Sequence, residues 1–245
     1  MHRFEHAAPR SIHRSHVKHT RARYLEPWLQ VWERKVAREM RPGIRVLDVG
    51  SGRRPAIPPD QRPPTCTYVG LDLSLEELGA APAGSYDEVV AADVVAFQPQ
   101  LADRFDVVLS WQVLEHVRPL DAAVENIRRY LVPGGIFLAH LSGGFSAFAL
   151  LNRLVPHQLG VWALRRLLGR DPRTVFPAHY DQCWYGALVR TTSTWTAAEV
   201  LPRYRGSGYF RFLGVLERAY LFYEDWTVRR GHRNLATHYL ISARR

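Results

Sequence analysis

Val46-Leu47-Asp48-Val49-Gly50-Ser51-Gly52 joins a short apolar run to an acidic residue and a Gly-x-Gly turn. A short apolar run that is closed by turn residues is typical of a buried strand. Glycine at positions 50 and 52 permits positive φ, and because it has no Cβ the backbone can approach a ligand closely. The stretch therefore predicts a buried strand that leads into a loop able to hold a nucleotide.

Four more apolar runs follow at intervals that leave room for helices. The second and third runs each end in an acid, at Tyr68–Asp72 and Val89–Asp93. The fourth is Phe105–Ser110, and the fifth, Ile136–His140, comes after the turn residues Pro133-Gly134-Gly135. Strand and helix signals that alternate in this way predict right-handed βαβ units and a parallel sheet.

Helical signals lie before and between these runs. Apolar residues recur at helical spacing from Tyr24 to Met40, which predicts an amphipathic helix that packs on the sheet or caps the ligand cleft. Ser74-Leu75-Glu76-Glu77 has the pattern of a capping box. Asp121 precedes an apolar stripe that extends to Leu131, as expected for a crossover helix.

The signals are weaker after the fifth run. Thr191–Arg205 is polar and β-branched and suits a strand, whereas Phe210–Val228 predicts a helix that Gly231 ends. The apolar face of this helix comprises Leu213, Leu216, Tyr220 and Tyr223. Thr237–Ala243 predicts a closing strand.

Together with Leu114-Glu115-His116 after the fourth run, this ordered series resembles the class I S-adenosylmethionine-dependent methyltransferases, most closely their type 11 small-molecule group. The resemblance covers roughly residues 43–142. It implies an α/β, Rossmann-like, doubly wound and mostly parallel seven-stranded sheet, with the closing strand antiparallel at the sheet edge. It also implies that S-adenosylmethionine is the cofactor and that the protein is a methyltransferase.

One stretch departs from the family pattern. In the family a helix begins directly after the glycine turn, and its amino-terminal dipole faces the ligand carboxylate. Here five prolines follow Gly52, and proline lacks the N–H that a helix interior needs. These prolines are Pro55, Pro58, Pro59, Pro63 and Pro64. We therefore expect no long regular helix here: either the carboxylate meets Arg53 or Arg54 instead, or the helix is a single turn.

The resemblance implies ten cofactor-binding residues, all at or just beyond the ends of the first four runs. They are Asp48, Gly50, Ser51, Gly52, Asp72, Leu73, Asp93, Val94, Ser110 and Trp111. The glycine turn would face the methionine part, and Ser110 and Trp111 would line the sulfonium pocket. Asp72 would accept hydrogen bonds from both ribose hydroxyls, a role that suits a carboxylate at a strand end, and Asp93 would accept one from the adenine amino group.

Methyl transfer requires alignment of the acceptor and, for a hydroxyl acceptor, a general base. His140, at the end of the fifth run, is the first candidate, and His179 and Tyr180 come next. His140 and His179 are also compatible with a packing or surface role. The spaced histidines near the amino terminus lack a cysteine or acid partner, so we predict no metal site.

We expect one domain built from four segments. Residues 1–41 form a basic amino-terminal arm and helix, and residues 42–142 form the S-adenosylmethionine-binding core. Residues 143–185 carry two apolar stripes and are expected to form a helical insertion that covers the cleft as a lid. Residues 186–245 complete the same domain.

The composition of the 245 residues is that of an ordinary globular protein, with 47% hydrophobic and 23% charged residues. The net charge is +10, and residues 1–41 carry ten Lys and Arg against four Glu. Two cysteines and no apolar stretch of about 18 residues predict a cytoplasmic protein without a membrane span. Peripheral membrane contact through the basic arm stays open, as does the oligomeric state.

We predict O-methylation of a small-molecule partner, which would be a sugar, polyketide or lipid-linked intermediate of bacterial secondary metabolism. A nucleic-acid-directed or protein-directed methyltransferase and a non-catalytic S-adenosylmethionine-binding protein are alternatives, although the Asn-Pro-Pro-Tyr and Pro-Cys motifs frequent in nucleic-acid methyltransferases are absent. A nicotinamide-dependent oxidoreductase is a remote alternative, because its fingerprint needs a third glycine where this chain has Pro55.

Overall fold

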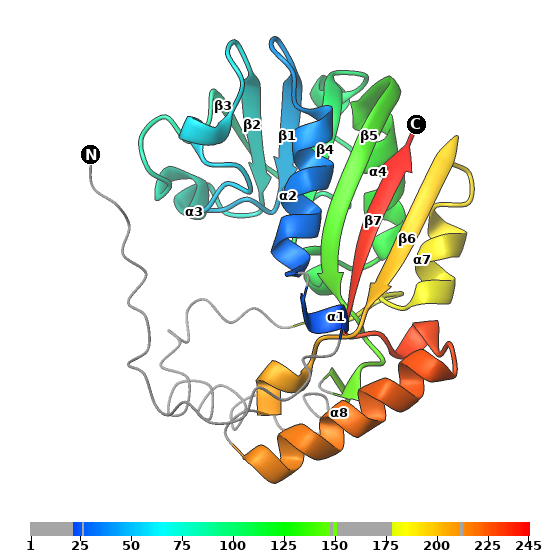
Figure 1. The fold of residues 1–245 in the computed structure, drawn as a ribbon. Helices are drawn as coiled ribbons and strands as arrows, with labels where there is room; N and C mark the ends of the chain where they lie inside the picture. Colours follow the sequence, from blue (N-terminus) through cyan, green and yellow to red (C-terminus); the bar gives the residue numbers. More distant parts are fainter. Residues whose placement is uncertain (1–21, 26, 148, 151–177, 211–212) are drawn as a thin grey trace.

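Seven strands of the described chain form one sheet in the order β3-β2-β1-β4-β5-β7-β6 (Figure 1). The computed structural model describes residues 22–25, 27–147, 149–150, 178–210 and 213–245. The strands are β1 (Arg45–Val49), β2 (Thr67–Asp72), β3 (Glu88–Ala91), β4 (Phe105–Trp111), β5 (Leu131–Ser142), β6 (Ala197–Arg203) and β7 (His238–Arg244). Strands β1 to β5 are parallel, and β7 runs antiparallel to both β5 and β6. The predicted doubly wound α/β fold is confirmed.

Helices of the described part cover both faces of this sheet and one of its ends. They are α1 (Ala22–Leu25), α2 (Trp28–Glu39), α3 (Leu75–Gly79), α4 (Leu120–Tyr130), α7 (Tyr185–Thr191) and α8 (Gly214–Arg229). Figure 1 shows α2 on one face of the sheet and α4 on the other. The helix predicted from Tyr24 to Met40 is in fact two helices, α1 and α2. Pro27 stands between them with a ψ of 129°. A proline cannot donate the hydrogen bond that would continue α1 through this position.

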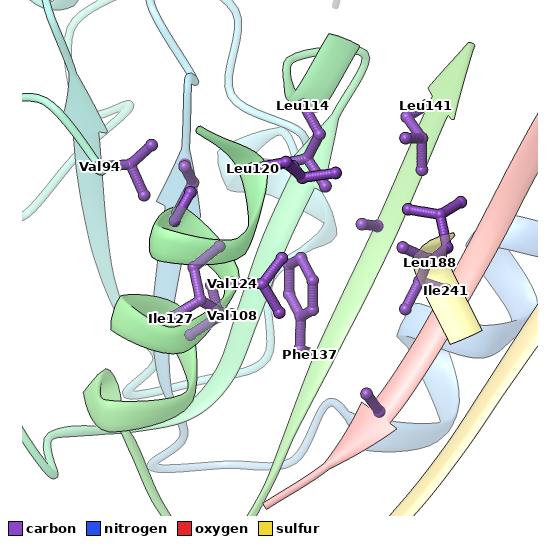
Figure 2. Packing of buried hydrophobic residues seen from close by; sticks show 14 of the residues in the cluster. Val94, Val108, Leu114, Leu120, Val124, Ile127, Phe137, Leu141, Leu188 and Ile241 are labelled. Atoms are coloured by element: carbon purple, nitrogen blue, oxygen red, sulfur yellow. The ribbon is translucent and has the colours of Figure 1, made fainter. Parts of the chain in front are cut away.

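The two faces of the central strands bury separate hydrophobic clusters. Val46 of β1 and Leu109 of β4 pack with Trp32 and Val36 of α2 on one face. On the other face, shown in Figure 2, residues of α4 pack against Val108 and Phe137. A parallel strand that is covered on both faces needs apolar residues at successive positions. This explains why the first, second and fourth runs could be recognised as strands.

Strand β5 begins earlier than predicted. Pro133-Gly134-Gly135, expected to be a turn, lies inside β5 at a bulge. Phe105 pairs with Leu131, but Val107 already pairs with Ile136, so β5 has extra residues at this point. The bulge accommodates them because Gly134 adopts a φ of +79°.

The carboxyl-terminal strands also correct an expectation. The resemblance placed the closing strand at the sheet edge, but β7 lies between β5 and β6, and β6 forms the edge.

Helix α8 ends at Arg229, and Gly231 follows with a φ of +67°, as predicted. Its predicted apolar face is only partly correct, because Tyr220 is buried while Leu213 and Leu216 are exposed. The expected helical hairpin of residues 143–185 falls largely on residues 151–177, outside the described part.

The α4 face provides a test of the packing. Ile127 is completely buried, whereas the neighbouring Arg128 makes an exposed ion pair with Glu125. Ile127→Ala should lower the free energy of unfolding by about 2–5 kcal/mol, because it leaves a cavity under the helix. Arg128→Ala, the matched control, should change it by less than about 0.5 kcal/mol. Urea unfolding followed by circular dichroism measures both; equal effects of the two variants would contradict this packing.

Candidate functional site

The crevice between β1 and β4 is the point at which the strand order reverses. From β1 the chain first builds outward to β2 and β3 and then returns to β4 on the other side. Open α/β sheets bind ligands outside the carboxyl ends of their strands at such a point. The Gly50–Gly52 turn follows β1 there, Asp72 ends β2, and Trp111 ends β4.

The glycine turn is pinned to the end of β2. The N–H of Gly50 donates to the carbonyl of Leu71 at 2.7 Å, and the N–H of Gly52 donates to Oδ2 of Asp72 at 3.0 Å. Gly50 has a φ of +71°, and a Cβ at this position would lie 2.3 Å from the side chain of Val113. Only glycine fits this position without a shift of its neighbours, so the turn keeps its backbone close to the crevice.

Asp72 organises the turn and the start of α3 together. Its Oδ1 accepts a hydrogen bond from the N–H of Ser74 at 3.0 Å, while Oδ2 holds Gly52. The Oγ of Ser74 accepts from the N–H of Glu77 at 3.1 Å and caps α3. A carboxylate has about four acceptor positions, so Asp72 retains acceptor capacity for a further donor. The predicted capping box is formed on the serine side.

The other half of that capping box is replaced by an ion pair. The Glu77 carboxylate binds the Arg53 guanidinium, with Nε 2.7 Å from Oε2, and this contact lowers the pKa of Glu77. Arg53, which we predicted as a partner of the ligand carboxylate, thus already contacts an acid. Its neighbour Arg54 is exposed and lines the cavity beside α2.

Asp48 holds the proline-rich segment against the sheet. Its Oδ2 accepts hydrogen bonds from the N–H of Ala56 and the hydroxyl of Tyr68, both at 2.7 Å. The Tyr68 oxygen in turn accepts from the N–H of Ile57 at 3.1 Å. Burial raises the pKa of Asp48 to about 6. These contacts direct the carboxylate toward the segment after the turn, and its assignment to the cofactor stays a prediction.

The segment between β1 and β2 contains no α-helix, as the prolines predicted; it forms one 3-10 turn, η1 (Pro59–Gln61). A cavity of about 1050 Å³ lies between this segment and α2. Trp32 of α2 and Trp111 at the end of β4 both line it, with their ring centroids 5.0 Å apart. The missing helix thus leaves an aromatic-walled space that reaches the carboxyl end of β4.

His140 lies inside a stack of rings at the same end of the sheet. Its completely buried ring lies 4.6 Å from the ring of Trp111 and 5.1 Å from that of His238. Burial lowers the pKa of His140 well below its usual value and that of His238 to about 4. Both imidazoles are therefore neutral at neutral pH. Sequence reasoning missed His238, because only the pairing of β7 with β5 brings it beside His140.

His179 and Tyr180 lie against a different element. The N–H groups of both residues donate to the carbonyl of Glu115 at 2.9 Å, in the 3-10 turn η3 (Leu114–His116). His179 is exposed and Tyr180 is buried. The Glu115 carboxylate is buried and accepts from the N–H of Ser142 at 3.2 Å. The Leu-Glu-His motif therefore joins β5 to the segment that follows residue 177.

The remaining predicted cofactor residues differ in exposure. Ser51, Val94 and Ser110 are buried, whereas Leu73 is exposed. Asp93 lies just beyond β3 and accepts a hydrogen bond from the N–H of Val95 at 2.9 Å. Among the ten predicted cofactor-binding residues, Gly52 and Asp72 contact each other directly through the hydrogen bond described above. The absence of a metal site stays a prediction from the sequence. Among the described residues there is no cluster of three side chains that could hold a metal ion.

The raised pKa of Asp48 predicts a pH dependence of stability. A folded-state pKa of about 6 against the usual 3.8 means that the folded chain binds this proton more tightly. The bound proton therefore stabilises the folded state at low pH, and this stabilisation is lost as pH rises from about 4 to about 6. Asp48→Asn cannot ionise, so its free energy of unfolding relative to wild type should rise by about 3 kcal/mol across this range.

Urea unfolding at several pH values measures this difference. Asp60→Asn is the matched control, because Asp60 is exposed in η1 of the same segment. The free energy of unfolding of the control should change with pH in the same way as that of wild type. Parallel curves for Asp48→Asn and wild type would contradict the buried, proton-sensitive role of Asp48.

Comparison with known proteins agrees with this architecture. Residues 15–176 match the family model described as a methyltransferase domain. The chain is 34% identical over 136 residues to a ubiquinone biosynthesis O-methyltransferase of Agrobacterium fabrum, a match that covers 54% of this chain and 50% of that protein. A protein of the same name from Paramagnetospirillum magneticum is 34% identical over 117 residues, which cover 45% and 47% of the two chains. The chain thus spans about half the length of the curated relatives it matches.

Solved structures share the fold at low identity. The phosphoethanolamine N-methyltransferase 2 of Haemonchus contortus, solved with phosphomonomethylethanolamine and S-adenosylhomocysteine, superposes with a TM-score of 0.52 and 16% identity. The match covers 89% of this chain and 52% of that chain. The finer assignment to the type 11 group stays a prediction. The sheet order and the family match show that this chain belongs to the methyltransferase domain family, with the fold of the class I S-adenosylmethionine-dependent methyltransferases.

Proposed function

We propose that this protein transfers a methyl group from S-adenosylmethionine to an oxygen atom of a small molecule. The observation that carries the proposal is the Gly50–Gly52 turn, held by Asp72 at the crevice where the strand order reverses. The turn has the close backbone approach and the adjacent carboxylate that a nucleoside needs. The curated relatives named O-methyltransferases support oxygen as the acceptor atom.

The residues at the crevice fit S-adenosylmethionine. Gly50 is required because a Cβ would collide with Val113, and this close packing holds the turn at the carboxyl end of β1. Asp72 has acceptor capacity for the ribose hydroxyls, and Asp93 follows the neighbouring strand at the position proposed for the adenine. We assign Ser51, Leu73, Val94, Ser110 and Trp111 to the remaining walls of this site. When bound, the cofactor would supply an activated methyl group on a sulfonium sulfur.

The chain's own contribution is to align the acceptor and to accept its proton. We assign proton acceptance to His140, since burial lowers the pKa of its imidazole, which is therefore in the neutral form that can act as a base at neutral pH. Trp111 and His238 fix the plane of its ring through stacking. His179 and Tyr180 are the next candidates, because Glu115 anchors their backbone to the motif after β4.

The acceptor that we favour is an apolar, lipid-linked molecule, ahead of a sugar or a polyketide. The cavity lined by Trp32 and Trp111 supports this choice, because aromatic and aliphatic walls suit an apolar group. The relatives' name includes ubiquinone biosynthesis, which is consistent with an apolar acceptor. Cys66 and Cys183 form no disulfide with each other, which fits the proposed cytoplasmic location. Among the described residues, no helix has the length and apolar character of a membrane span.

Cofactor binding tests the first step. Asp72→Ala should weaken the binding of S-adenosylhomocysteine at least about 100-fold, because two charge-assisted hydrogen bonds of roughly 1.5–3 kcal/mol each would be lost. Glu76→Ala, an exposed acid in α3, should bind as wild type does. Isothermal titration calorimetry measures both, with urea unfolding as a check of the fold. Tight binding of NADH in place of S-adenosylhomocysteine would instead support an oxidoreductase.

The base assignment has a separate test. His140→Ala should lower kcat by about 10²–10⁴-fold on any phenol or alcohol that wild type methylates, while the affinity for S-adenosylhomocysteine stays unchanged. Formation of S-adenosylhomocysteine over a range of pH provides the readout. Near-normal kcat at every pH would remove His140 from the role. A loss of turnover only with His179→Ala or Tyr180→Phe would transfer the role to that residue.

A further inference from the structure

Helix α8 has a buried side and a separate, exposed apolar side. One side carries the buried residues Tyr220, Glu224 and Thr227 and packs against η5 (Ser207–Phe210). A second stripe recurs at intervals of four, three and four residues, as expected for one face of a helix. It consists of Val215, Ala219, Phe222 and Trp226.

This second stripe lies on the opposite side of the helix from the buried residues. At 3.6 residues per turn its four members fall within about 60° of one another. Val215 is 75% exposed, Phe222 68% and Trp226 46%. Large side chains at this exposure on one face of a helix indicate a contact surface, whereas singly scattered ones would need no explanation.

Most charges of α8 divide between the same two sides, and Asp225, which lies between them, is paired with Arg23. Glu224 is buried and binds Arg23 and the hydroxyl of Tyr24, and Asp225 contacts the same Arg23 guanidinium at 2.6 Å. Glu217 lies on the buried side by its helical position. The exposed cations beside the stripe are Arg218 and Arg229 of α8 and Arg230, which follows its last residue. The outward side of α8 therefore combines apolar residues with positive charge.

The position of α8 connects this surface with the proposed site. Figure 1 shows α8 beyond the end of the sheet at which β5 finishes, which is the end that carries His140 and the glycine turn. An apolar acceptor that resides in a membrane would reach the protein from this end.

We propose that the outward side of α8, formed by Val215, Ala219, Phe222 and Trp226 with Arg218, Arg229 and Arg230, binds the surface of an anionic lipid membrane. A helix with an apolar aromatic stripe and flanking arginines lies in the plane of the membrane interface, with its apolar side among the acyl chains. Tryptophan is favoured at this depth, and each arginine is attracted to anionic headgroups. This proposal does not depend on methyl transfer.

Co-sedimentation of the full chain with vesicles tests the proposal. Vesicles of phosphatidylcholine mixed with phosphatidylglycerol should sediment the protein, and vesicles of phosphatidylcholine alone should sediment less of it. The double variant Phe222→Ser with Trp226→Ser should bind the mixed vesicles at least about tenfold more weakly, because two large apolar side chains leave the acyl chains. Arg218→Gln should weaken binding by about fivefold and flatten its dependence on salt.

Val189→Ser is the matched control, because Val189 is 41% exposed on α7 and should leave vesicle binding unchanged. Unfolding in urea and S-adenosylhomocysteine affinity show that each variant is folded. No binding by wild type, or equal binding by the double variant, would overturn the proposal; the second result would assign lipid binding to another basic part of the chain. A wild-type dimer that the double variant dissociates, without vesicle binding, would overturn it in favour of self-association.

Discussion

The Asp48 carboxylate is the contact on which the arrangement of the site depends. The prolines after Gly52 prevent a regular helix, so the N–H groups of Ala56 and Ile57 find their partners outside the segment. Asp48 accepts from the N–H of Ala56 and from Tyr68, which links the segment back to β2. Because Asp48 belongs to β1, one buried acid fixes where the chain goes after the glycine turn. The cavity beside α2 exists because this segment is held in place without a helix.

A second constraint acts on the other side of the crevice. The pairing of β7 with β5 places His238 beside His140, and Trp111 closes the stack from β4. Residues of the three strands β4, β5 and β7 thus hold the neutral ring of His140 in place. The rings of Trp111 and His238 lie against His140, whose side chain is completely buried. Helix α8 lies between β6 and β7 in the chain and beyond the end of the sheet at which β5 finishes, so the residues that would handle the acceptor and those that would face a membrane lie at one end of the sheet.

The sequence predicted the strands well, because β1, β2 and β4 are buried on both faces and therefore read as continuous apolar runs. It also predicted the effect of the prolines, since a missing N–H is a local property. The missed features depend on contacts that are distant in sequence or on single residues inside a strong pattern. Pro27 interrupts a helical stripe that is otherwise continuous, and His238 gains its meaning only from strand pairing. The outward stripe of α8 was hidden because the helix is apolar on two sides and periodicity indicated only one.

A crystal structure of the protein grown with S-adenosylhomocysteine would test the central claim most directly. The account predicts that the nucleoside occupies the crevice at the carboxyl ends of β1 and β4. It should lie against the Gly50–Gly52 turn, with its ribose hydroxyls on the Asp72 carboxylate. A nucleoside bound elsewhere, or a crevice that stays empty at saturating ligand, would contradict the proposal that this methyltransferase domain binds and uses S-adenosylmethionine.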